Sequence, residues 1–188
     1  MTGGILLGVL ILFLVWAVST YNGLVRLKHE LARAWSNIDV LLKQRHDELP
    51  KLVEICRQYQ QFEAATLTRV IEARSQVAHA REALDIESLG HAENALRAGL
   101  AQIFAVAEQY PELQADQRYA ELQQRVVALE NAIADRRETF NDAVTANNVR
   151  VEQFPDTVIA RMFRFDTRSP LRFTSEEKSD VNLGKLFH

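Results

Sequence analysis

Residues 3–18 read GGILLGVLILFLVWAV and contain no charged side chain, and the first charged side chain of the chain is Arg26. As a helix, residues 3–21 would extend about 28 Å at ~1.5 Å per residue, close to the roughly 30 Å hydrocarbon core of a bilayer. Trp16 and Tyr21 stand near the end of the stretch, where aromatic rings favour the headgroup zone. We therefore predict a membrane-spanning helix that includes Ile5, Leu6, Leu7, Gly8, Val9, Leu10, Ile11, Leu12, Phe13, Leu14, Val15, Trp16, Ala17 and Val18.

Two other interpretations of this stretch compete with a retained span. A cleaved signal peptide is one, because Ala17-Val18-Ser19 loosely resembles a cleavage site. Such peptides carry Lys or Arg before the apolar segment, and this chain has neither there. A buried core helix is the other, and the absence of a polar stripe argues against it. A lipid anchor is excluded because the only cysteine is Cys56. Residues 1–25 are thus expected to form a transmembrane anchor.

The charges that flank the span predict its orientation. Five basic residues follow it within residues 26–45, and no Lys or Arg precedes it. The side richer in Lys and Arg tends to stay in the cytoplasm. We expect the N-terminus outside and the remainder of the chain in the cytoplasm.

The composition of the 188 residues favours helices. Seven glycines and four prolines are few, which disfavours a turn-rich all-β fold. One cysteine excludes an internal disulfide framework and a cysteine-rich metal site. The net charge of −3 gives no support to nucleic acid as a partner. The fold class expected is all-α.

Apolar residues beyond the span recur at alternating steps of three and four, the spacing of amphipathic helices. The first series begins at Leu24 and runs toward Pro50, where we expect the helix to end or to kink. Further series cover residues 52–84, 89–110 and 119–151. Residues 26–152 are therefore expected to form an antiparallel bundle of four long helices, or of three if Pro50 only kinks the chain. Residues 153–188 lack a sustained period and are expected to form an irregular tail.

The sequence carries no recognisable catalytic motif. Its five histidines form neither HExxH nor a Glu-x-x-His pair, and no glycine-rich phosphate loop occurs. Cys56 stands without a neighbouring motif and is expected to be a structural thiol. We therefore assign no catalytic, cofactor-binding or metal-binding residue, and we expect a protein that is not an enzyme.

Two features outside the apolar pattern are candidates for specific contacts. Glu93 occupies a position where the pattern expects an apolar residue. An unpaired buried charge is costly, so we predict that Glu93 pairs across helices with Arg74, Arg136 or Arg137; exposure at the helix edge is the alternative.

In the tail, residues 160–173 read ARMFRFDTRSPLRF and interleave basic and aromatic side chains. Such a segment can contact an anionic bilayer surface or a partner protein, and the alternative is that its phenylalanines dock onto the bundle. The candidates are Arg161, Phe163, Arg164, Phe165, Arg168, Arg172 and Phe173.

Several short motifs of the chain resemble the LemA family. They are AWSNIDVLLKQR at 34–45, LPKLVE at 49–54, AVAEQYPEL at 105–113 and RETFNDAV at 137–144. The chain departs from the family pattern at Asn147-Asn148, where a second Tyr-Asn pair is usual. The resemblance implies a bacterial inner-membrane protein with one N-terminal span, a cytoplasmic helical bundle, and no established activity or cofactor. It also implies an association with membrane-bound zinc proteases and envelope stress.

These observations lead to two hypotheses about function. The first is a membrane-anchored, non-enzymatic helical scaffold that self-assembles, because Gly4 and Gly8 form a Gly-x-x-x-Gly pattern that permits close approach of transmembrane helices. The second is an adaptor for a membrane-bound protease or a signalling complex, with residues 161–188 as its docking segment. The expected partners are the lipid bilayer, further copies of the chain and a membrane protein.

Overall fold

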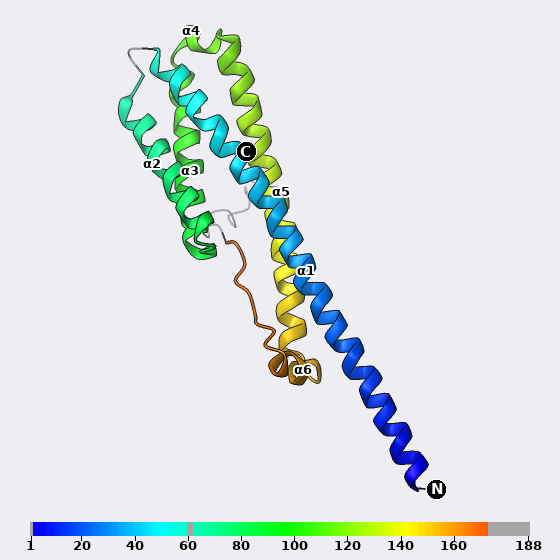
Figure 1. The fold of residues 1–188 in the computed structure, drawn as a ribbon. Coiled ribbons are helices and arrows are strands. Elements are labelled where there is room, and N and C mark those ends of the chain that lie inside the picture. Colours follow the sequence, from blue (N-terminus) through cyan, green and yellow to red (C-terminus); the bar gives the residue numbers. More distant parts are fainter. Residues whose placement is uncertain (1, 60–61, 173–188) are drawn as a thin grey trace, which may run out of the picture. The chain divides into compact units, whose positions relative to one another are not determined.

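The computed structural model describes residues 2–59 and 62–172 of the chain. Within these residues the structure has no strand, and the expected all-α fold is confirmed. Its helices are α1 (Thr2–Arg57), α2 (Ala64–Glu82), α3 (Ile86–Ala107), α4 (Pro111–Gln114), α5 (Gln117–Glu152) and α6 (Asp156–Met162) (Figure 1).

The described residues divide into two compact units. Unit 1 contains the chain up to Ile38 together with Arg136–Pro170, and unit 2 contains Asp39–Asp135 together with Leu171 and Arg172. The boundaries fall inside α1 and α5, so each of these long helices contributes to both units.

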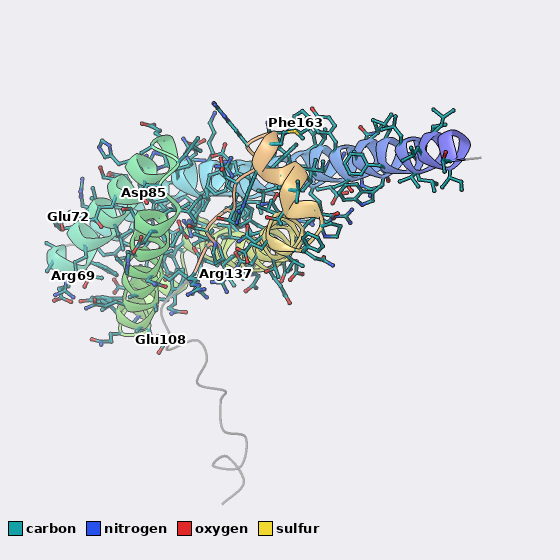
Figure 2. All side chains as sticks on the ribbon, turned by 90° about the horizontal axis from the view of Figure 1, so that it is seen from below. Arg69, Glu72, Asp85, Glu108, Arg137 and Phe163 are labelled. Atoms are coloured by element: carbon teal, nitrogen blue, oxygen red, sulfur yellow. The ribbon has the colours of Figure 1, made fainter. Side chains whose placement is uncertain are left out.

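Unit 2 is a bundle built around a pair of packed helices. α2 and α3 run antiparallel and are joined by residues 83–85 (Figure 1). They approach closely at Gly99, where an added Cβ would lie only 2.8 Å from Cγ2 of Val70. Figure 2 shows the exposed charged side chains Arg69 and Glu108 on the outside of this pair. The core residues of unit 2 are aliphatic or aromatic and include Leu42, Leu49, Leu52, Val70, Val77, Leu89, Leu96, Ile103, Leu113, Tyr119, Val126 and Ile133.

Pro50 does not end the first helix, because α1 continues through it to Arg57. A proline inside a helix has no N–H for the carbonyl four residues earlier, which here belongs to His46. That carbonyl instead accepts a hydrogen bond from Nε of Arg74 on α2, at 3.0 Å. Of the two expectations for Pro50, the end of the helix there is therefore wrong, and so is a single helix over 52–84. The break lies between Arg57 and Ala64.

Unit 1 joins the N-terminal part of α1 to the C-terminal part of α5 and to α6. The rings of Trp35 and Phe140 pack with their centroids 5.7 Å apart. The start of the tail is not irregular as expected, since Asp156–Met162 forms α6. α6 contributes Ile159 and Ala160 to a buried cluster, so burial of this short helix supplies the order that its sequence period did not indicate.

The chain after α6 is held to α5 by two asparagines. Nδ2 of Asn147 donates to the carbonyl of Asp166 at 3.1 Å. Asn148 binds the backbone of Arg168 twice, since its Nδ2 donates to the carbonyl and its Oδ1 accepts from the N–H, both at 2.8 Å. The two side chains that depart from the family pattern thus fix the backbone of the tail.

Within unit 2, the end of the described chain lies against α3. Leu171 is buried, and the carbonyl oxygen of Arg172 lies where a side chain at Gly90 would be, 2.3 Å from an added Cβ. Only glycine leaves room for this backbone approach. A glycine at position 90 of α3 is therefore required where the backbone of residue 172 crosses this helix.

Candidate functional site

The N-terminal part of α1 exposes apolar side chains on every side. Its large side chains from Ile5 to Val15 are 52–71% exposed. Among the described residues, α1 is the one helix with a stretch long and apolar enough to cross a membrane, and none of that stretch is buried within the protein. The interpretation as a core helix is thus excluded, and the chain fits a single-pass membrane protein.

Where this apolar stretch ends, α6 packs against α1. The buried residues Leu24, Val151, Ile159 and Ala160 form one cluster, and Trp16, Ala17 and Phe165 pack against it. We call these seven residues the boundary cluster. Its α1 members span residues 16–24, the region in which the sequence places the end of the membrane span.

Polar side chains also stabilise the contact between α6 and α1. The hydroxyl of Thr20, which is buried on α1, donates to Oδ1 of Asp156 at 3.3 Å. Oδ2 of Asp156 forms an ion pair with Nε of Arg150 on α5. Because Asp156 is the first residue of α6, this network ties the start of α6 to both long helices.

The basic and aromatic candidates of the tail divide into two sets. Phe163 and Phe165 contact Tyr21, with ring centroids 4.8 and 5.8 Å apart, and Phe163 nevertheless remains 53% exposed at the end of α6 (Figure 2). The arginine side chains are exposed, namely Arg161, Arg164, Arg168 and Arg172. Phe173 lies outside the described residues.

α6 and the turn before it carry exposed apolar side chains that the sequence pattern did not predict. Phe154, Val158 and Met162 are 79%, 52% and 64% exposed. Val158 and Met162 are four residues apart and so lie on one side of α6, opposite to Ile159 and Ala160, which are buried, and Phe154 lies in the turn just before α6. Two apolar residues four apart within a seven-residue helix are too short a signal to predict α6 from the sequence.

Glu93 lies in a buried cluster of charges in unit 2. Glu93 and Arg45 are both 1% exposed and form an ion pair. Nη1 of Arg45 also contacts Oε1 of Glu130 at 2.6 Å, and Oε2 of Glu130 lies 3.5 Å from Nε of Arg97. The expected set of partners requires correction, because Arg45 was not in it and Arg74 instead contacts His46. Arg136 and Arg137 lie in unit 1.

Burial sets the protonation of this cluster. Burial raises the pKa of Glu93 above the ordinary value of a glutamate, although the positive charge of Arg45 opposes the shift. Burial also acts to lower the pKa of Arg45, but the facing carboxylates of Glu93 and Glu130 outweigh it and raise that pKa. Arg45 is therefore charged at every physiological pH. The cluster joins α1, α3 and α5 through ion pairs of Arg45 with Glu93 and Glu130.

Cys56 and the histidines are the remaining reactive side chains of the described residues. Burial raises the pKa of the Cys56 thiol to about 12, which leaves no thiolate for nucleophilic attack. Over residues 2–59 and 62–172, no three His, Cys, Asp or Glu side chains lie close enough to hold a metal ion.

Comparison with known proteins gives one family and several named relatives. Residues 34–183 match the sequence model of the LemA family. The chain is 23% identical over 171 residues to magnetosome proteins MamQ 1 and MamQ 2 of Paramagnetospirillum magneticum, covering 79% of this chain and 63% of each relative. It is 24% identical over 174 residues to protein LemA of Metamycoplasma hominis, covering 90% of this chain and 76% of that protein. The chain thus spans less than two thirds of the two magnetosome proteins.

Proposed function

This chain belongs to the LemA family, and we propose that it is a membrane-anchored, non-enzymatic helical scaffold that assembles with further copies of itself at the bacterial inner membrane. The observation that carries the anchor is the exposure of apolar side chains around α1 from Ile5 to Val15. Exposed apolar surface in water costs roughly 25 cal/mol per Å². Lipid chains remove that cost, and the helical bundle then lies on the cytoplasmic side, as the basic residues after the span favour.

In this proposal α6 lies in the headgroup zone beside the span. The boundary cluster attaches α6 to residues 16–24 of α1. The exposed apolar side chains on α6 and just before it face the acyl chains; they are Phe154, Val158 and Met162. The exposed Arg161 and Arg164 face anionic headgroups. Basic residues beside an apolar stripe are typical of helices that lie on membranes.

Assembly is proposed to use the glycines of the span. An added Cβ at Gly4 or Gly8 would meet no atom within 4 Å, so this side of α1 is open to a second helix. Small residues four apart allow two transmembrane helices to approach closely. The enclosure and pairing of Arg45 and Glu93 support a structural role for the charges of unit 2.

Light scattering of the full chain in detergent micelles tests this proposal. We expect an oligomer at micromolar concentration, where a monomer would have a protein mass of 21.4 kDa. Gly4→Ile with Gly8→Ile should lower the mass, and Gly3→Ile is the matched control that leaves the Gly-x-x-x-Gly pattern intact. A monomeric mass for the unsubstituted chain would contradict self-assembly.

The exposed side chains after residue 160 favour a second candidate function. Met162 and Phe163 are more than half exposed among exposed arginines. An adaptor for a membrane-bound protease or an envelope-stress complex could use this surface. It predicts that deletion of 161–188 abolishes crosslinking to one partner in cells while circular dichroism still reports helices. Crosslinking that survives the deletion would contradict this function.

A further inference from the structure

A groove runs along α1 from the apolar span to the first charged residue. Its volume is about 670 Å³. Seven of its lining residues lie on α1, and the last comes from α5 within the same unit. They are Leu14, Val15, Val18, Ser19, Asn22, Gly23, Arg26 and Arg150.

The chemistry of the groove changes in one direction. Leu14, Val15 and Val18 form its apolar end, Ser19 and Asn22 its neutral polar middle, and two arginines its charged end. From residue 14 to residue 26, α1 advances roughly 18 Å at ~1.5 Å per residue. A phospholipid offers the same order of groups from its acyl chain through its ester oxygens to its phosphate. We propose that this groove binds one anionic phospholipid, with the phosphate between Arg26 and Arg150.

The two arginines suit a phosphate group. Guanidinium groups present several N–H donors in a fixed geometry that matches phosphate oxygens. Arg26 is exposed, and no carboxylate among the described residues forms an ion pair with it. Nε of Arg150 pairs with Asp156, so its guanidinium is held in place beside α1. None of the residues that line the groove is acidic.

Gly23 lies beside the guanidinium of Arg150. An added Cβ there would lie 3.5 Å from Nη2 of Arg150, which is an ordinary van der Waals distance. The guanidinium therefore lies close to the backbone of α1 at the charged end of the groove. A free phosphate would use only this end, whereas a lipid also uses the apolar end. This difference favours the lipid as the occupant.

This inference rests on the proposed membrane anchor, and its test separates the two. The full chain is reconstituted in bilayers that contain equal amounts of phosphatidylglycerol and phosphatidylcholine, and resistance to carbonate extraction confirms insertion. The chain is then released into detergent, and native mass spectrometry measures the lipids that stay bound. We expect one phosphatidylglycerol per chain, retained at least about tenfold over phosphatidylcholine, a ratio that corresponds to roughly 1.4 kcal/mol.

Arg26→Gln should lower this preference toward equal retention. Lys28→Gln is the matched control, because Lys28 is exposed two residues further along α1 and does not line the groove. An inserted chain that shows no preference, or an equal preference in both variants, overturns the lipid site and leaves the anchor intact. Displacement of the bound lipid by millimolar inorganic phosphate would also overturn it, since it would indicate a site for free anions.

Discussion

The two parts of α1 differ in how much of their apolar side chains is exposed. Between Ile5 and Val15 every large apolar side chain is more than half exposed, whereas Leu42, Leu49 and Leu52 are at most 2% exposed. The second part has a stripe that neighbouring helices cover, and among its charged residues Lys43 and Asp47 are exposed whereas Arg45 is buried and paired with Glu93. The first part has no such stripe. One helix can therefore require lipid at one end and protein neighbours at the other, and the pattern of exposure distinguishes the two.

The largest expected effect comes from placing charge in each part of α1. Leu10→Arg with Phe13→Arg should prevent membrane insertion, because each charge at the centre of a span costs roughly 2.5–3.5 kcal/mol. Leu42→Asp should leave insertion intact and unfold unit 2, because it buries an unpaired carboxylate. Carbonate extraction measures insertion, and protease resistance of the bundle measures folding. If Leu42→Asp also abolished insertion, the two parts of α1 would not differ as described.

Loss of the buried arginine should have the next largest effect. Arg45→Met leaves Glu93 buried without its partner, which typically costs ~3–5 kcal/mol. At ~2–4 °C per kcal/mol, the unfolding midpoint of the full chain in detergent should fall by about 6–20 °C. Arg45→Met with Glu93→Leu should recover much of that loss, because neither buried charge then remains unpaired. A double variant as unstable as the single one would contradict the pairing.

A third experiment tests how α1 passes through Pro50. Arg74→Met removes the donor to the half-buried His46 carbonyl and should cost ~0.5–1.5 kcal/mol, the typical net contribution of a protein hydrogen bond. In a Pro50→Ala background the backbone N–H of residue 50 can bind that carbonyl, so the same change should cost clearly less. Thermal unfolding of the four proteins gives the coupling. Equal costs in both backgrounds would show that Arg74 does not compensate for the proline.

The smallest expected effect is the contribution of His46 to the pH dependence of folding stability. Burial, followed by the charge of Arg74 on α2, lowers the pKa of His46 below its ordinary value. The folded state therefore binds the proton less well than the unfolded state, and the stability contributed by neutral His46 is lost as the pH falls through ~6.5 and below.

His46→Gln should remove the part of the stability loss between pH 7.5 and 5.5 that comes from protonation of His46. The exposed His79→Gln is the control. The comparison uses the difference in slope between variants, since the raised pKa of Glu93 contributes with the opposite sign. Identical slopes for the His46 and His79 variants would contradict the assignment.

The sequence was sufficient to predict the features that depend on local pattern. The uninterrupted apolar run predicted the exposed segment of α1, and the spacing of apolar residues predicted long helices. The position of Glu93 within such a pattern predicted a buried charge but could not identify Arg45, because the partner depends on how helices pack. The same limit applies to Pro50, whose tolerance depends on Arg74 on another helix.

The tail shows a different limit of prediction from sequence, because its helix is short. α6 has only seven residues, too few for its period to be recognised directly after Pro155. Its order comes from burial against α1 and from the backbone contacts of Asn147 and Asn148 with the chain that follows it. These are tertiary contacts between segments far apart in the sequence. The exposed stripe of Phe154, Val158 and Met162 becomes meaningful only once α6 is placed on α1.

The central claim is that the apolar segment stays attached and holds this protein in the membrane. Intact-mass measurement of the native protein, made on carbonate-washed membranes and on the soluble fraction, tests it directly. The account predicts a membrane-bound species that retains residues 5–18 and resists extraction. A mature protein that begins near Thr20 and is recovered in the soluble fraction would contradict the account.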